Sequence, residues 1–326
     1  MPRIAVIGAG LIGRSWAIVF AAAGWEVALH DADPQAAEAA LGGVAEGLAD
    51  LARHDLVADA PAAAARVRIA ATLAQALDGA SFVQENLPET VAVKQAIFTE
   101  LDRRAAPDAI LASSTSSIVP SLFTENLAGR ARCLVAHPVN PPHLVPLVEL
   151  LGSPWTQPAV IAKARAIYQA VGQVPITVNR EIEGFILNRL QGALLAEAFR
   201  LVGAGYVSPQ DLDKTLQDGL GLRWSFMGPF ATIELNAPGG MADYCARYAG
   251  FYRRLQENPA TAAVFDKENV ERILAQWQSP PVDRLPRLAR ERDQRLAALK
   301  AHKSRGGVEQ TAAPGTAPRK PLSGPR

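Results

Sequence analysis

A strand, a glycine-rich turn, a helix and a second strand follow one another at the start of the chain. Residues 3–7 are a short apolar run, typical of a buried parallel strand, and the glycine after it opens the motif Gly8-Ala9-Gly10-Leu11-Ile12-Gly13. An apolar helix is expected from there to Ala23, and Glu26–His30 resumes as a strand. This order of elements is a βαβ unit, so the chain is expected to build a parallel sheet.

Further short strands alternate with helices up to about residue 180. The expected strands are Val67–Ala70, Ser81–Gln84, Ile110–Ser113, Cys133–His137, Val145–Leu151 and Val174–Val178. Thr90–Arg104 is an example of the helices expected between them. Such alternation predicts an α/β fold with a Rossmann-type, doubly wound and mostly parallel sheet, in a first domain of residues 1–183.

A smaller all-α domain is predicted for residues 184–302, where no strand pattern is found. Leu190, Leu194, Ala198 and Leu201 share one helix face. Ser208 and Pro209 have the residue types of a helix N-cap and of the first helical position.

The last stretch, residues 303–326, is rich in Gly, Pro and Ser and is predicted to be a disordered tail. It is basic, with five Lys and Arg against one Glu, although the whole chain has a formal net charge of only +1. The balanced total gives no reason to expect nucleic acid or a membrane as a partner.

Two cysteines, Cys133 and Cys245, lie in unlike contexts without a Cys-x-x-Cys pair, so neither a disulfide framework nor a metal site is expected. The apolar run that opens the chain ends at Gly8 and is too short for a signal peptide, and no run approaches the length of a transmembrane helix. We therefore expect a cytoplasmic protein.

The glycine-rich turn has the spacing and context of a dinucleotide site. Gly8 allows the tight turn, Gly10 lets the backbone approach a pyrophosphate, and Gly13 lets helix and strand pack closely. Leu11 and Ile12 start the helix, whose N-terminal N–H groups and dipole favour phosphate. A glycine turn without a ligand is the alternative.

Asp31, at the end of the second strand, indicates which dinucleotide is bound. A carboxylate there can accept hydrogen bonds from the adenosine ribose and repels a 2′-phosphate, and no arginine lies beside it. NAD is therefore favoured over NADP. Asp31 could instead cap the next helix, but Asp33 before Pro34 is the better candidate for that role.

His137 follows a buried strand at the carboxyl edge of the expected sheet, where doubly wound folds bind ligands. A histidine can take a proton from an alcohol near neutral pH, and a buried carboxylate such as Glu149 would orient it and stabilise the imidazolium. From these residues alone the dyad is a hypothesis, because a histidine and a glutamate at this spacing are often unrelated.

Several motifs in order give the chain a resemblance to the L-3-hydroxyacyl-CoA dehydrogenase family, over about residues 3–300. They are the serine motif Ala112–Ser117, the histidine motif His137–Pro141 with Glu149 at the matching distance, and Glu183–Arg189, with the sequence Glu-Gly-Phe-Ile-Leu-Asn-Arg.

The resemblance implies roles for individual residues. His137 would be the general base, oriented by Glu149, while hydride passes to NAD. Ser116 and Asn188 would hydrogen-bond the substrate oxygen, and Asn140 would support them. Glu89 and Lys94 fall at positions that contact the cofactor in the family. Three of these residues also have plainer interpretations: a turn residue for Ser116, a helix cap for Asn188 and a solvated charge for Lys94.

Residues 218–229 distinguish branches within the family. This stretch departs from the acyl-CoA enzymes and is similar to the branch of lambda-crystallin and L-gulonate 3-dehydrogenase, with L-carnitine dehydrogenases next. Arg223 lies within it, and a guanidinium suits a substrate carboxylate that a thioester lacks. A structural ion pair is the alternative role for Arg223. For Trp224 and Phe226 we expect a place in the core, with the lining of the substrate pocket as the alternative.

The leading hypothesis is therefore NAD-dependent oxidation of a small L-3-hydroxy acid, as in L-gulonate 3-dehydrogenase. The alternatives are a short-chain 3-hydroxyacyl-CoA dehydrogenase, an L-carnitine dehydrogenase, and a non-catalytic structural protein, since lens crystallins come from this branch. The resemblance also implies a homodimer formed through the helical domain.

Overall fold

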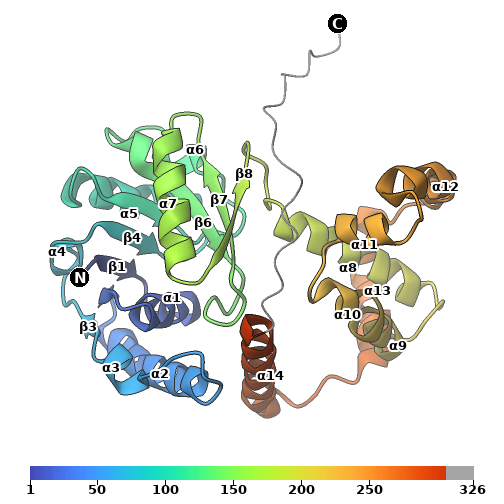
Figure 1. The fold of residues 1–326 in the computed structure, drawn as a ribbon, viewed down its shortest axis with the longest axis horizontal. Coiled ribbons are helices and arrows are strands. Elements are labelled where there is room, and N and C mark those ends of the chain that lie inside the picture. Colours follow the sequence, from blue (N-terminus) through green and yellow to red (C-terminus); the bar gives the residue numbers. More distant parts are fainter. Residues whose placement is uncertain (306–326) are drawn as a thin grey trace, which may run out of the picture. The chain divides into compact units, whose positions relative to one another are not determined.

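A computed structural model describes residues 1–305, which form two compact units. The first unit is Met1–Phe185 together with the segment that begins at Pro286, and the second is Ile186–Leu285. Figure 1 labels the elements of both units.

The first unit contains an eight-stranded sheet in the order β3-β2-β1-β4-β5-β6-β7-β8. Its strands are β1 (Arg3–Ile7), β2 (Glu26–His30), β3 (Val67–Ile69), β4 (Phe82–Glu85), β5 (Ile110–Ser113), β6 (Cys133–Pro138), β7 (Leu147–Gly152) and β8 (Val174–Val178). All neighbouring pairs are parallel except β6 and β7, which run antiparallel. The predicted α/β class and mostly parallel sheet are confirmed.

Helices cover both faces of this sheet. They are α1 (Leu11–Ala22), α2 (Pro34–Ala52), α3 (Ala60–Ala64), α4 (Leu73–Leu77), α5 (Val91–Arg104), α6 (Ser121–Thr124) and α7 (Pro158–Ala170). The helix α14 (Leu285–Arg305) also belongs to this unit, from Pro286 onward. Ile4 and Val6 of β1 pack on one face with Trp16 of α1, while Ala5 and Ile7 pack on the other. The strict alternation along β1 follows from side chains pointing to opposite faces of a strand.

Helix caps lie where the sequence predicted them. The Asp33 side chain accepts a hydrogen bond from Gln35 N at the start of α2, with Pro34 in the first turn. The Ser208 side chain accepts from Asp211 N at the start of α9, with Pro209 following it. Each cap satisfies an N–H group that the helix itself leaves unpaired.

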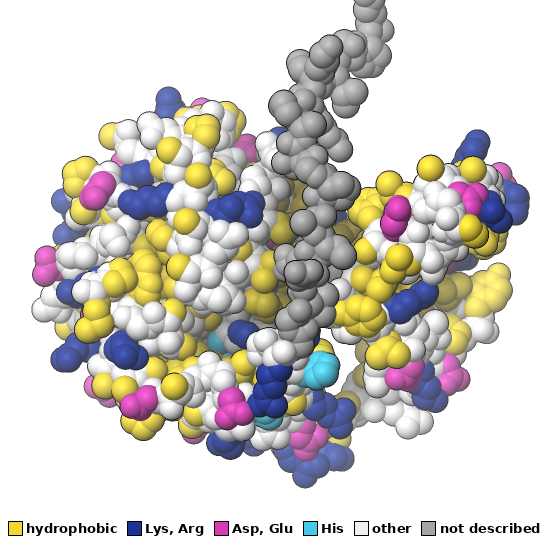
Figure 2. Space-filling view, in the orientation of Figure 1, with side chains coloured by type: hydrophobic (Ala, Val, Ile, Leu, Met, Phe, Trp, Pro, Cys, Tyr) yellow, Lys and Arg dark blue, Asp and Glu magenta, His cyan; other side chains and the backbone are white. Residues whose placement is uncertain are grey.

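The second unit is helical throughout. Its elements are α8 (Leu187–Gly203), α9 (Pro209–Lys214), the π-helical turn η2 (Thr215–Leu220), α10 (Gly221–Trp224), α11 (Pro229–Leu235), α12 (Gly240–Leu255) and α13 (Lys267–Trp277), with short 3-10 turns at Ala262–Phe265 and Val282–Arg284. Large apolar side chains stay exposed on it, among them Leu222, Phe226, Phe230 and Leu235. Figure 2 shows apolar side chains on the outside of these helices. Trp224 and Phe226, both expected in the core, are exposed.

One boundary differs from the prediction. The helical domain was expected to run to residue 302, but α14 belongs to the first unit, where Ala297 and Ala301 are buried. The helix continues to Arg305, so the start of the predicted tail is helical. The rest of that tail, residues 306–326, lies outside the described residues.

Within residues 1–305, none of the helices has the length and apolar character needed to span a membrane. The same residues contain no group of three or more His, Cys, Asp and Glu side chains that could hold a metal ion.

Candidate active site

The glycine-rich turn between β1 and α1 is closely packed at two of its three glycines. Gly8 has a φ of +95°, and a Cβ there would lie 2.9 Å from the carbonyl oxygen of Asn86. A Cβ on Gly13 would lie 1.8 Å from the carbonyl oxygen of Gly8. A Cβ on Gly10 would meet nothing within 4 Å. The turn itself therefore requires Gly8 and Gly13, whereas Gly10 keeps open the space beside the backbone.

Helix α1 begins at Leu11 with Gly10 as its N-cap, and glycine has no side chain that could accept a hydrogen bond from the first N–H groups. Leu11 and Ile12 thus start a helix whose first N–H groups and positive dipole end can receive an anion.

Asp31 lies directly beside this turn. Its carboxylate accepts hydrogen bonds from Ala9 N at 2.7 Å and from Asp33 N at 3.0 Å. The sequence did not predict the contact with Ala9, which joins residues 22 positions apart. An acidic group held at the glycine turn, the open space at Gly10 and the uncapped helix start fit an NAD molecule with an unphosphorylated adenosine ribose.

His137 and Glu149 are direct neighbours across the antiparallel pair β6 and β7. His137 Nδ1 lies 2.7 Å from Glu149 Oε2, with side-chain exposures of 8% and 1%. The ring of Phe185 packs against the imidazole, with 5.5 Å between ring centroids. A buried carboxylate on Nδ1 holds the imidazole in place and directs Nε2 to any reacting group.

Glu89 organises the serine motif that follows β5. Its Oε1 accepts hydrogen bonds from Thr115 Oγ1 at 2.6 Å, Ser116 N at 2.8 Å and Ser117 N at 3.0 Å. Burial acts to raise the pKa of Glu89, but these hydrogen bonds and the charge of Lys94 outweigh it and hold the pKa below its ordinary value. The ionised carboxylate therefore fixes the backbone that carries Ser116.

Lys94 is fully buried against Glu85, a partner that the sequence analysis missed. Its ammonium donates to Glu85 Oε1 at 2.8 Å, to Glu85 Oε2 at 3.0 Å and to the carbonyl oxygen of Leu87 at 2.9 Å. Ser113 Oγ also donates to Glu85, at 2.6 Å. The plainer interpretation of Lys94 as a solvated charge is wrong, because its side chain is only 1% exposed. An acidic residue at the end of a buried strand was the signal that could have indicated Glu85.

The remaining predicted residues lie on other elements. Asn140 is exposed in the loop between β6 and β7. Asn188 is the second residue of α8, and Arg223 is exposed on α10, both in the helical unit. Within that unit, the pKa of the Tyr244 hydroxyl is raised, mainly by its hydrogen bond with Tyr252. The positive charge of Arg223 opposes this shift in part.

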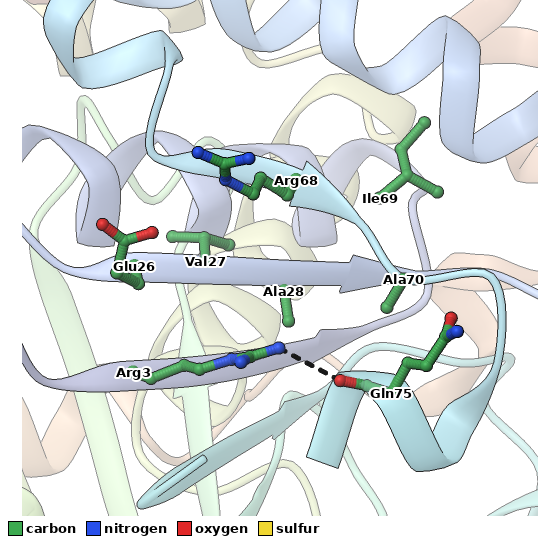
Figure 3. A pocket seen from close by; sticks show the side chains of 8 residues that line it. All are labelled: Arg3, Glu26, Val27, Ala28, Arg68, Ile69, Ala70 and Gln75. Carbon is green, nitrogen blue, oxygen red and sulfur yellow. Dashed lines mark hydrogen bonds between the residues drawn. The ribbon is translucent and has the colours of Figure 1, made fainter. Parts of the chain in front are cut away.

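A separate hollow of about 450 Å³ lies over β1, β2 and β3 (Figure 3). Arg3, Glu26, Arg68 and Gln75 surround it, and Arg3 donates to the carbonyl oxygen of Gln75 at 3.1 Å. Arg3 and Glu26 are the first residues of their strands, whereas doubly wound folds bind substrates beyond the carboxyl ends. None of the predicted site residues lines this hollow.

The fold, the dinucleotide turn and the buried His–Glu contact define an NAD-dependent dehydrogenase. The NAD-binding domain of 3-hydroxyacyl-CoA dehydrogenase matches residues 3–182, and the C-terminal domain of the same enzymes matches residues 184–276. The chain therefore belongs to the 3-hydroxyacyl-CoA dehydrogenase family.

Individual relatives place it in the lambda-crystallin branch of that family. A lambda-crystallin homolog from Rattus norvegicus is 41% identical over 273 residues, covering 83% of this chain and 85% of the relative. An L-carnitine dehydrogenase from Pseudomonas putida is 38% identical over 250 residues, covering 76% and 77%. The crystal structure of 5-formyl-3-hydroxy-2-methylpyridine 4-carboxylic acid 5-dehydrogenase, an NAD+-dependent dismutase, has a TM-score of 0.82 at 26% identity and covers 93% of this chain and 99% of its own.

Proposed function

We propose that the enzyme oxidises the 3-hydroxyl of a small L-3-hydroxy acid to the 3-keto acid, as L-gulonate 3-dehydrogenase does. The observation that carries this proposal is the 2.7 Å contact between His137 Nδ1 and the buried carboxylate of Glu149. NAD supplies the hydride acceptor when it is bound.

In this mechanism His137 Nε2 takes the proton of the substrate hydroxyl. Glu149 keeps the other proton on Nδ1, so that Nε2 is the basic nitrogen, and it stabilises the imidazolium formed by the transfer. Ser116 and Asn188 hydrogen-bond the substrate oxygen, and Asn140 supports them. The Ser116 hydroxyl, which donates to Glu89 Oε1 at 3.2 Å in this structure, turns its one proton to the substrate for this purpose. Glu89 holds Ser116 through its backbone N–H at 2.8 Å and accepts from its hydroxyl at 3.2 Å.

The cofactor contacts are Gly8, Gly10, Leu11, Ile12, Gly13 and Asp31, with Glu89 and Lys94 as further contacts that the family resemblance implies. Since all three protons of the Lys94 ammonium have acceptors in the chain, we infer that Lys94 acts by fixing the turn from Glu85 to Glu89.

Arg223 is the proposed partner of the substrate carboxylate. It is exposed on a short helix that directly follows a π-helical turn, a feature that is frequent at functional sites. A free carboxylate matches the planar guanidinium, whereas the thioester of an acyl-CoA is neutral. A short-chain 3-hydroxyacyl-CoA is the second candidate substrate, because the chain matches the 3-hydroxyacyl-CoA dehydrogenase family. L-Carnitine is the third, because one relative is an L-carnitine dehydrogenase.

The experiment is NADH production from L-gulonate, L-3-hydroxybutyrate, L-carnitine and L-3-hydroxybutyryl-CoA, ranked by kcat/KM. The proposal expects a free hydroxy acid to rank first, and a preference for the CoA ester would overturn it. Absence of turnover with all four, in protein that still binds NAD, would favour the crystallin-like structural role.

A homodimer through the helical unit completes the proposal. The exposed Leu222, Phe226, Phe230 and Leu235 support it, because a second copy packed on them would remove large apolar side chains from water. Sedimentation of the full chain tests it, with a dimer mass expected and a monomer at micromolar concentration contradicting it. The cytoplasmic location stays a prediction.

A further inference from the structure

Helix α14 packs against the unit that holds His137, although 100 residues of the helical unit precede it in the chain. Ala297 and Ala301 are buried there, and Ala297 belongs to the same apolar cluster as Leu144. Leu144 lies in the loop of residues 139–146, which connects β6 to β7. One end of this loop follows His137 and the other precedes Glu149.

Lys300 makes the polar contact between the helix and this loop. Its ammonium donates to the carbonyl oxygen of His143 at 2.8 Å. The contact is half-buried, and burial lowers the pKa of Lys300. A charge is costly to bury, so an ammonium held at this place must have a specific acceptor to be tolerated.

Backbone hydrogen bonds within the loop add to the contact with Lys300. Leu144 N and Val145 N both donate to the carbonyl oxygen of Pro141, at 2.9 and 3.0 Å, and close the loop on itself. Burial lowers the pKa of the His143 imidazole to about 4, with Asp293 opposing and Lys300 adding to the shift, so this ring is neutral near pH 7. The neutral ring adds no repulsion to the Lys300 ammonium.

We propose that Lys300 is a positioning residue for the reaction: its hydrogen bond to the His143 carbonyl fixes the 139–146 loop and so the alignment of His137 with Glu149. This inference rests on the acid–base role proposed above for His137 and Glu149. Misplacement of a catalytic group by about 1 Å can cost on the order of a hundredfold in rate, which makes an anchor outside the site consequential.

The test compares Lys300→Met, Lys300→Gln and Lys300→Arg in the full chain. Met removes the donor, whereas Gln and Arg keep N–H groups that can donate to the His143 carbonyl. We expect Lys300→Met to lower kcat by roughly tenfold or more with KM for NAD unchanged, because the lost contact holds the loop beside His137. Lys300→Arg and Lys300→Gln should recover much of kcat. Unchanged kcat in Lys300→Met, or no recovery with Arg and Gln, overturns the proposal.

Arg305→Gln is the matched control on the same helix. It removes the ion pair of Arg305 with Asp55, 2.6 Å long, and leaves the loop contact intact. Wild-type kcat is expected for this variant. An equal loss of kcat would show that helix docking in general matters and would overturn a specific role for Lys300.

Hydrogen–deuterium exchange gives a readout that does not depend on activity. In Lys300→Met, peptides covering residues 139–146 should exchange faster than in the wild type, and unchanged protection would overturn the proposal. Activity of His137→Gln, measured in parallel, tests the acid–base role by itself. The two proposals can therefore fail separately.

Discussion

The Nδ1 atom of His137 lies 2.7 Å from Oε2 of Glu149, across the single antiparallel strand pair of the eight-stranded sheet. In an antiparallel pair, residues directly opposite each other have their side chains on the same face at close range. The reversal of β7 thus sets His137 against Glu149 through the register of the sheet.

Glu149→Gln should lower kcat strongly while the protein stays folded. The amide can still hydrogen-bond the imidazole but carries no charge to stabilise the imidazolium. By analogy with the aspartate of serine proteases, the loss should be roughly a hundred- to ten-thousandfold in kcat, measured by NADH formation at saturating substrate. Glu100→Gln, at an exposed site, is the control with wild-type kcat expected. A Glu149→Gln enzyme within about threefold of the wild type would contradict the proposed dyad.

Gly10→Ala and Gly13→Ala should fail in different ways. The added methyl group of Gly13→Ala would overlap the Gly8 carbonyl oxygen, at 1.8 Å, so we expect a lower melting temperature as well as lost NAD binding. The methyl group of Gly10→Ala would meet no atom of the chain within 4 Å, so the melting temperature should stay near that of the wild type. If NAD approaches Gly10, its Kd should nevertheless rise, which calorimetry measures. Wild-type affinity in Gly10→Ala would contradict this cofactor placement.

Lys94→Met should be among the most destabilising single substitutions in the first unit. It leaves the carboxylate of Glu85 buried without its cation, and removing one partner of a buried pair costs about 3–5 kcal/mol. Urea unfolding should show this loss, and the double variant Lys94→Met/Glu85→Gln should recover part of it. A double variant less stable than Lys94→Met alone would show that the other contacts of Glu85 dominate.

Glu89→Gln should lower the stability of the fold at neutral pH but not at acid pH. The pKa of Glu89 is lowered from 4.5 in the folded state, so its charge stabilises the fold above that pH. This contribution decreases as the pH falls through the lowered pKa. The urea midpoints of wild type and Glu89→Gln should therefore differ at neutral pH and converge at acid pH. If the urea midpoints differed by the same amount at every pH, the loss of stability would come from altered packing and not from the lost charge.

Local signals in the sequence determined the elements well. The strands Ile110–Ser113 and Val174–Val178 have the predicted bounds, because each is a short apolar or β-branched run that ends abruptly. Asp33 and Ser208 cap the helices expected from their side chains. Such features depend on a few adjacent residues, which a single sequence displays directly.

Long-range contacts were not predictable in the same way. Nothing near Glu85 indicates Lys94 as its partner, and nothing near Asp31 indicates the N–H group of Ala9. Helix α14 is rich in arginine and lysine, so its sequence indicates an exposed helix. Its buried face consists of the small residues Ala297 and Ala301, which do not indicate the unit against which the helix packs. These contacts depend on the tertiary arrangement and become visible only in the structure.

Arg223→Met tests the choice of substrate. If the guanidinium binds a carboxylate, KM for the preferred hydroxy acid should rise roughly ten- to a hundredfold, as for a lost charged hydrogen bond, with KM for NAD unchanged. Methionine keeps much of the length and apolar character of the arginine stem. Arg253→Met, on α12 of the same unit, is the matched control and should leave both KM values unchanged. Equal KM values in Arg223→Met and wild type would assign Arg223 a structural role. The CoA ester would then be the favoured substrate.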